Sequence, residues 1–244
     1  MFTETFAAEL STWSAAVISR LLPTFDNVEV EADEIASAEF TRLGQRPVSE
    51  DSYMEMADAA ELAYSEGLAH YERMAGVRQG LLNLATAGLY HLFEQQAALL
   101  VRKELITPRE EHDAEFMTKL LKPGRMITEF EGRLLASGVD LKALSSYTRL
   151  DELRLVANVV KHGSGSSAEQ LMARVPMLFV HPLLRESNRA TRPQPWSVSA
   201  GKRSPRVVDR PLAGNDVFVT AKEFELYAAG VVALWAELAE LLSA

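Results

Sequence analysis

Apolar side chains recur at intervals of three and four residues along most of the chain, the spacing of helices with one buried face. The first such stretch, residues 3–22, stops before Pro23, which cannot continue a helix. Its apolar positions share one helical face: Phe6, Leu10, Trp13, Val17, Ile18 and Leu21. The pattern predicts an amphipathic helix here and a second helix over about 32–43.

The most apolar stretch lies in the middle of the chain. Residues 50–75 are rich in Ala, Glu, Met and Leu and predict a helix, and Gly76 predicts a break after it. Residues 77–105 place leucine or phenylalanine on most sides of a helix: Leu81, Leu82, Leu84, Leu89, Leu92, Phe93, Leu99 and Leu100. A helix that is apolar on most sides is typical of the centre of a bundle.

Three helix starts are marked by a Thr or Ser followed three residues later by Glu, a pair that can cap the first turn. The pairs are Thr107 with Glu110, Ser166 with Glu169, and Thr220 with Glu223. Further helices are predicted over about 125–136 and 148–162.

The predicted elements together indicate an all-α protein, a helical bundle of about eight helices. We expect a single helical domain over 1–244. Within it, 1–76 holds the N-terminal helices, 77–175 the core and 220–243 the C-terminal helix. One short strand is predicted at 217–219.

The amino-acid composition limits both the cellular compartment and the kinds of site that this bundle can have. The 244 residues include no cysteine, which excludes disulfides, thiolate nucleophiles and cysteine zinc sites and favours a reducing compartment. The chain shows neither a leader pattern nor an uncharged apolar run long enough to span a membrane. We therefore expect a cytoplasmic, bacterial protein with no membrane contact. The chain contains no phosphate-binding loop, so we predict no nucleotide cofactor.

The net charge of −9 argues against nonspecific nucleic-acid binding by the whole surface. The charge is uneven, however, because residues 185–210 hold seven basic and two acidic residues and therefore a net charge of +5. The segment has no helical period, which predicts a long basic loop, and it contains Trp196. Basic groups beside an aromatic ring can hold single-stranded nucleic acid. A solvated loop and a contact with an acidic partner chain are the alternatives.

The most concentrated polar group of the sequence lies on the helix predicted over 148–162. Arg154, Asn158, Lys161 and His162 are spaced i, i+4, i+7 and i+8, which places them on one stripe. The other faces are apolar and are expected to be buried: Leu153, Leu155, Val156, Val159 and Val160.

The stripe carries the groups needed for metal-independent RNA cleavage, in which a 2′-hydroxyl attacks the adjacent phosphate. A histidine oriented by Asn158 can act as general acid or base near neutral pH. Arg and Lys can hold phosphate oxygens. We see no carboxylate close by on the same face, which argues against a metal-dependent nuclease.

The same residues also have an ordinary structural interpretation. Lys161 and His162 stand in the last turn, where cations interact favourably with the helix dipole and Gly163 can cap the end. Asn158 can be a buried hydrogen-bonding residue. Spacing alone leaves both interpretations open.

A second polar pair, His91 and Glu94, stands at i and i+3 on the predicted central helix. This spacing suits metal ligation, but no second pair of the kind accompanies it, so we predict no metal site. A His–Glu hydrogen bond inside the bundle is the favoured interpretation. Glu94 can alternatively face the stripe and tune His162, which makes His91 and Glu94 candidates for substrate binding beside Lys161.

The sequence Asn158-Val-Val-Lys-His162-Gly, on a late helix of an all-helical chain, resembles the motif helix of the HEPN superfamily ("higher eukaryotes and prokaryotes nucleotide-binding"). The stretch 90–94 (YHLFE) resembles an inner helix of that fold. The resemblance covers about 77–175. It implies a HEPN-like bundle, a metal-independent ribonuclease, a homodimer in which two motif helices meet, and a toxin–antitoxin or phage-defence setting.

On this resemblance His162 is the general acid or base, Asn158 orients it or contacts substrate, and Arg154 and Lys161 hold phosphate. The family usually has Arg five residues before the His, where this chain has Ala157. Arg154, on the same face, or Lys161 can supply the cation instead. The alternatives are a site that only binds RNA, and a non-catalytic interaction subunit that binds a partner protein of such a system.

Overall fold

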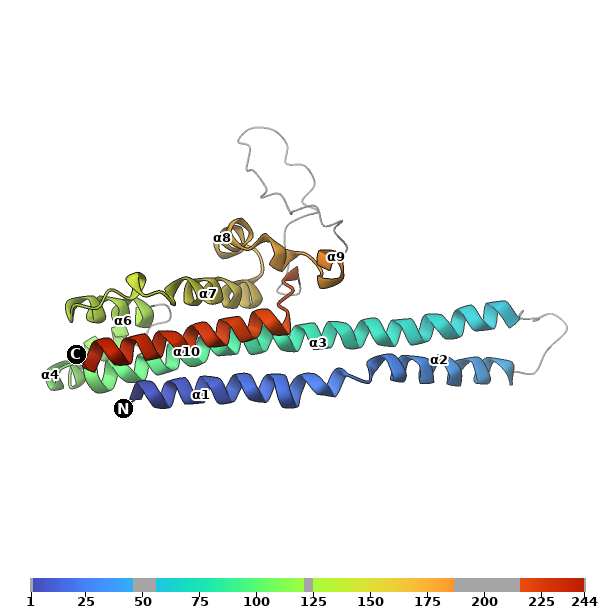
Figure 1. The fold of residues 1–244 in the computed structure, drawn as a ribbon, viewed down its shortest axis with the longest axis horizontal. Helices are drawn as coiled ribbons and strands as arrows, with labels where there is room; N and C mark the ends of the chain where they lie inside the picture. Colours follow the sequence, from blue (N-terminus) through green and yellow to red (C-terminus); the bar gives the residue numbers. More distant parts are fainter. Residues whose placement is uncertain (1, 46–55, 121–124, 187–215, 244) are drawn as a thin grey trace, which may run out of the picture. The chain divides into compact units, whose positions relative to one another are not determined.

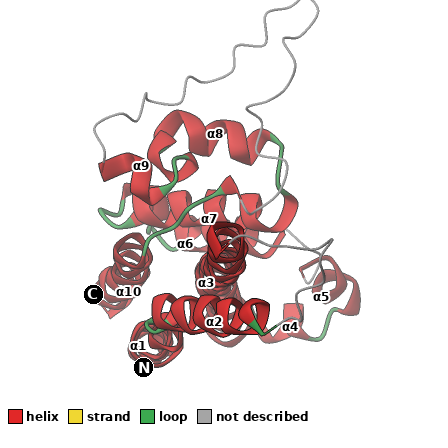
Figure 2. Cartoon of the chain, turned by 90° about the vertical axis from the view of Figure 1, so that its right-hand side faces the viewer, coloured by secondary structure: helices red, strands yellow, loops and turns green. Residues whose placement is uncertain are grey.

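The computed structural model describes residues 2–45, 56–120, 125–186 and 216–243. These residues are mostly helical and contain no strand (Figure 2), so the predicted all-α class is confirmed. The α-helices are α1 (Phe2–Ala16), α2 (Val28–Gly44), α3 (Met56–Leu100), α4 (Pro108–Glu111), α5 (Ala114–Leu120), α6 (Arg125–Ala136), α7 (Tyr147–His162), α8 (Ser166–Arg174), α9 (Pro182–Glu186) and α10 (Ala221–Ser243). A π-helical turn follows α1 (Val17–Leu21) and α3 (Val101–Leu105).

The chain forms two compact units, one of Met1–Ala16 with Leu82–Ala244 and one of Val17–Leu81. In the first unit, α10 lies beside α1 and beside the C-terminal part of α3 (Figure 1). α7 packs on α10, and α8 in turn packs on α7 (Figure 2). This order places α7, the predicted motif helix, between α10 and α8.

The core of the larger unit is an aromatic cluster around Trp235. The Phe6, Phe93 and Phe130 rings lie 5.0, 5.5 and 6.1 Å from it. Its indole N–H donates to the buried Gln96 Oε1 at 2.8 Å, and Gln96 Nε2 donates to the Phe6 carbonyl at 3.2 Å. One satisfied amide therefore joins α1, α3 and α10 inside an apolar core.

The segment before α10 is held by Asn83 and is not a strand, so the prediction for 217–219 was wrong. The Asn83 amide donates to the Val217 carbonyl at 2.7 Å and accepts from the Val219 N–H at 3.4 Å. A side chain of α3 thus supplies bonds that a neighbouring strand would otherwise make. Val217 and Val219 are fully buried.

Among the described residues, α10 is the one helix whose length and apolar composition are sufficient to cross a membrane. It buries Phe224, Leu234 and Trp235 within the larger unit. A core helix satisfies the same two criteria.

The smaller unit contains α2 and the first half of α3, which meet through small side chains. Ala32 of α2 is buried, as are Ala59 and Ala63 of α3. A Cβ placed on Gly67 would lie 2.6 Å from the Ala32 carbonyl oxygen and 3.1 Å from the Ala36 Cβ. The two backbones therefore approach closely, and a glycine is required at the contact.

Two local predictions were wrong. The break expected at Gly76 does not occur, because α3 runs without interruption through it; one glycine costs a helix about 1 kcal/mol, which the rest of a long helix offsets. Ser166 is not a cap, since α8 begins at that residue after Gly165 and without a side-chain cap bond. The boxes at Thr107 and Thr220 are confirmed, with both reciprocal bonds present.

Candidate functional site

The candidate site is built on α7, whose buried face anchors it to the larger unit. That face comprises Leu150, Leu153, Leu155, Val156, Ala157 and Val159. Gly163 ends the helix with φ of 69°, and its N–H donates to the Val159 carbonyl at 2.8 Å. A positive φ favours glycine, so the chain turns away here and leaves Lys161 and His162 in the last turn.

Lys161 and His162 are exposed, and neither side chain makes a hydrogen bond or an ion pair with the described residues. Asn158 is half-buried, and its amide donates to Ser167 Oγ of α8 at 3.4 Å. That bond links Asn158 to α8. The exposed end of α7 therefore presents an ammonium group and an imidazole to solvent.

Arg154 lies farther back along α7 and is bound by a carboxylate. Its Nε and one Nη lie 2.8 and 2.7 Å from Oδ1 of Asp151, and Arg174 of α8 donates to the other oxygen, Oδ2. The Asp151 side chain is only 14% exposed. Burial alone would raise the pKa of Asp151, but the hydrogen bonds from Arg174 and Arg154 outweigh it and lower the pKa. The expectation of no carboxylate near the stripe was therefore wrong.

Tyr90 of α3 lies within electrostatic reach of both Glu94 and Arg154. Burial raises the pKa of Tyr90, Glu94 raises it further, and Arg154 opposes them. Tyr147, at the start of α7, is affected in the same way: burial raises its pKa and Arg154 opposes the shift. α3 and α7 thus place two tyrosines within electrostatic reach of the Asp151–Arg154 pair.

His91 lies outside this group. It is exposed, and its Nδ1 lies 3.3 Å from Glu94 Oε2 while its Nε2 lies 3.1 Å from Gln95 Nε2. The predicted contact with Glu94 is present, but on the surface and not inside the bundle. Within the described ranges no group of three or more His, Asp or Glu is placed to hold a metal ion.

Sequence reasoning missed Asp151, Tyr147 and Arg174. Asp151 precedes Arg154 by three residues, and this ion-pair spacing was a usable signal. Arg174 joins the cluster only because α8 folds back onto α7, so helix spacing gave no signal for it.

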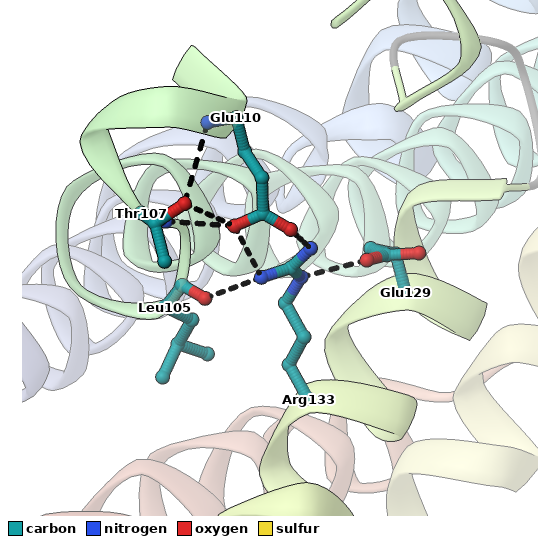
Figure 3. A network of polar contacts seen from close by, with 5 residues as sticks. All are labelled: Leu105, Thr107, Glu110, Glu129 and Arg133. Atoms are coloured by element: carbon teal, nitrogen blue, oxygen red, sulfur yellow. Dashed lines mark hydrogen bonds and ion pairs between the residues drawn. The ribbon is translucent and has the colours of Figure 1, made fainter. Parts of the chain in front are cut away.

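A second polar cluster surrounds Arg133 of α6 (Figure 3) and is structural. The guanidinium donates to the Leu105 carbonyl at 2.6 Å, to Glu129 Oε1 at 2.6 Å and to Glu110 Oε1 at 2.8 Å. Glu110 also completes the capping box with Thr107 (Figure 3). All three guanidinium nitrogens are thereby bonded, so Arg133 fixes the chain after α3 to α6.

The predicted basic loop, 185–210, lies outside the described residues except for its first two positions, and so does Trp196. Arg185 is half-buried: it donates to the Val180 carbonyl at 2.8 Å and to Glu223 Oε1 at 2.9 Å. This first cation of the segment therefore stabilises the start of α10.

Comparisons of the chain with protein-family models, with curated proteins and with solved structures found no match. The function must therefore be argued from the residues of α7 and their surroundings.

Proposed function

We propose that the chain is a HEPN-like protein that binds RNA at the C-terminal end of α7 and cleaves it without a metal ion. The observation that carries this proposal is the exposure of Lys161 and His162 at the end of a helix whose apolar face is buried. An exposed lysine can hold a phosphate oxygen, and an exposed imidazole can exchange protons near neutral pH. The setting that the resemblance implies is a bacterial toxin–antitoxin or phage-defence system, with the chain as a homodimer.

In the proposed reaction the neutral imidazole of His162 takes the proton of a ribose 2′-hydroxyl. The 2′-oxygen then bonds to the adjacent phosphorus, and the bond from phosphorus to the 5′-oxygen breaks. The leaving 5′-oxygen takes a proton from water, which gives a 2′,3′-cyclic phosphate and a 5′-hydroxyl, and the His162 imidazolium returns its proton to the resulting hydroxide. Lys161 would hold a non-bridging phosphate oxygen as negative charge builds up.

Arg154 has a more limited part in this proposal. Two of its guanidinium nitrogens face Asp151 Oδ1, which leaves the third for a phosphate. Asn158 would hold α8 beside the site through Ser167 and contact substrate with the rest of its amide. Glu94 would act through its field on Tyr90.

A non-catalytic interaction subunit is the second candidate, and the burial of Ala157 favours it. Ala157 stands where the family usually has arginine, and its side chain is 0% exposed. A cation could not reach the surface from this position without displacing the core. On this interpretation the end of α7 would bind a partner protein and not RNA.

The test is cleavage of total RNA and of tRNA by the purified full chain in EDTA. We expect wild type to cleave, and His162→Ala to lose at least about a hundredfold in rate, the usual contribution of a general acid or base. His112→Ala is the matched control, because His112 is also exposed and contacts only the Pro108 carbonyl in the described structure; it should keep the wild-type rate. Circular dichroism should show the same helix content in all three.

Cleavage by His162→Ala at the wild-type rate would remove His162 from the mechanism. If no protein cleaves, RNA binding decides between the two candidates. Lys161→Ala should then weaken RNA binding and reduce its salt dependence. Unchanged or absent binding would favour the interaction subunit.

A further inference from the structure

A continuous stripe of exposed side chains runs along the first half of α3. It consists of Glu61, Tyr64, Leu68, Tyr71, Ala75 and Arg78, and we call it the α3 stripe. Its members are spaced alternately three and four residues apart, which is the seam of a coiled coil. Tyr64 is 67% exposed, Leu68 42% and Tyr71 37%. Large apolar side chains aligned in this way on a surface indicate a contact with another molecule.

The α3 stripe is separate from the face of α3 that packs on α2. That face presents Ala59, Ala63 and Gly67, all of them small. On this half of α3 the small residues are therefore buried and the large apolar residues of the stripe are exposed, whereas α2 buries the larger Val28 and Leu43. Because α3 contributes mainly small side chains to the contact, a further helix laid on its open side would stabilise the hairpin.

We propose that the α3 stripe binds the same stripe of a second copy, with the two helices antiparallel about a two-fold axis near Leu68 and Tyr71. In a two-fold symmetric contact, when residue i of one copy faces residue j of the other, residue j of the first copy also faces residue i of the second. With Leu68 opposite Tyr71 of the second copy, Tyr64 falls opposite Ala75, and Glu61 falls opposite Arg78.

The stripe complements itself in this register in both volume and charge. Each tyrosine at position 64 meets an alanine, so large and small side chains alternate across the seam. Each end of the seam pairs a Glu61 carboxylate with an Arg78 guanidinium. Neither Glu61 nor Arg78 makes an ion pair with the other described residues, so both are available.

A parallel contact does not have this complementarity. In a parallel, in-register pair each residue meets its own copy, so Glu61 would face Glu61 and Arg78 would face Arg78. Like charges would repel at both ends, and the Tyr64 rings would crowd each other. The sequence of the stripe therefore selects the antiparallel arrangement.

The decisive experiment is a charge exchange read by sedimentation equilibrium of the full chain. Glu61→Arg and Arg78→Glu should each weaken the dimer at least about tenfold, since each creates two like-charge contacts. The double variant E61R/R78E should recover most of the wild-type affinity. The two positions are about 25 Å apart along one helix, too far for a pair within one chain. Recovery therefore requires the contact between copies.

A second pair of variants tests whether Leu68 lies at the apolar centre of the contact. Leu68→Glu should weaken the dimer at least about a hundredfold, because it buries a carboxylate in the seam of each copy. Val77→Glu is the matched control: Val77 is on the same helix and 49% exposed but off the stripe. It should leave the affinity within about twofold of wild type. Circular dichroism should show equal helix content in both variants.

Because the chain contains no cysteine, introduced cysteines can report the register of the contact directly. In a mixture of Leu68→Cys and Tyr71→Cys proteins, mild oxidation should give more cross-linked dimer than in either protein alone. A wild type that associates at tens of micromolar no more strongly than Leu68→Glu would overturn the proposal. A contact between two α7 helices, which the family resemblance implies, would persist equally in both proteins. Loss of RNA cleavage would not bear on it, because the stripe and the end of α7 belong to different units.

Discussion

Glu110 shows at the scale of one residue how packing changes an ionisation. The Arg133 guanidinium and the Thr107 N–H and hydroxyl lower its pKa from 4.5 to about 2. The folded state therefore holds the charged carboxylate more strongly than the unfolded chain does. The stability that Glu110 contributes is full above about pH 4.5 and is lost as the pH falls toward 2.

The lowered pKa of Glu110 should account for part of the loss of stability of the larger unit in acid. We expect the free energy of unfolding of wild type to fall as the pH is lowered from 4.5 to 2. Glu110→Gln should have a lower free energy of unfolding at pH 7, and this free energy should change less over the same pH range. Urea unfolding at several pH values measures both. Glu111→Gln, an equal change of charge at the exposed neighbour, should keep the wild-type slope; a slope unchanged in Glu110→Gln would contradict the assignment.

The residues of the candidate site were partly visible in the sequence. The spacing of Arg154, Asn158, Lys161 and His162 places them on one helix. The apolar positions around them are buried as expected, except Val160, which is only half-buried. The spacing could not show that Asn158 bonds to Ser167, or that Arg174 shares the Asp151 carboxylate with Arg154. Those contacts depend on the path of the chain after Gly163, which local patterns do not specify.

At the scale of the element, helix ends were easier to predict than helix continuity. The capping boxes at Thr107 and Thr220 join residues only three apart, so a local pattern predicts them, although Ser166 and Glu169 have the same spacing and α8 has no side-chain cap bond. The prediction at Gly76 failed because the break or continuation of a helix depends on what the flanking turns pack against. No local signal distinguishes Gly67, at a helix contact, from Gly76, with open space beside it.

Replacing each of these two glycines with alanine should have opposite effects on the free energy of unfolding. Gly76→Ala meets nothing within 4 Å and should stabilise α3 by about 0.5–1 kcal/mol through helix propensity. Gly67→Ala should destabilise the hairpin, because the new methyl would lie 2.6 Å from the Ala32 carbonyl oxygen. Urea unfolding followed by circular dichroism compares the two. Equal effects of the same sign would show that α2 and α3 do not approach this closely.

At the scale of the molecule, α3 belongs to two units with different cores. Its second half contributes Leu89, Phe93 and Ala97, all 0% exposed, to the core around Trp235. Its first half buries mainly Ala59, Ala63 and Gly67. Burial of apolar area is the main favourable term in folding, so the two halves of one helix should differ in local stability.

Hydrogen exchange should reveal this difference directly. At low protein concentration, amides of 56–81 should exchange faster than amides of 82–100, because the first half can open without disrupting the aromatic core. Raising the concentration should slow exchange in 56–81 alone, since a second copy on the α3 stripe stabilises only the state that binds it. Leu68→Glu should abolish this concentration dependence and leave exchange in 82–100 unchanged. Equal protection along all of α3 at low concentration would contradict the division into two units, whereas a concentration-independent difference would contradict only the contact between copies.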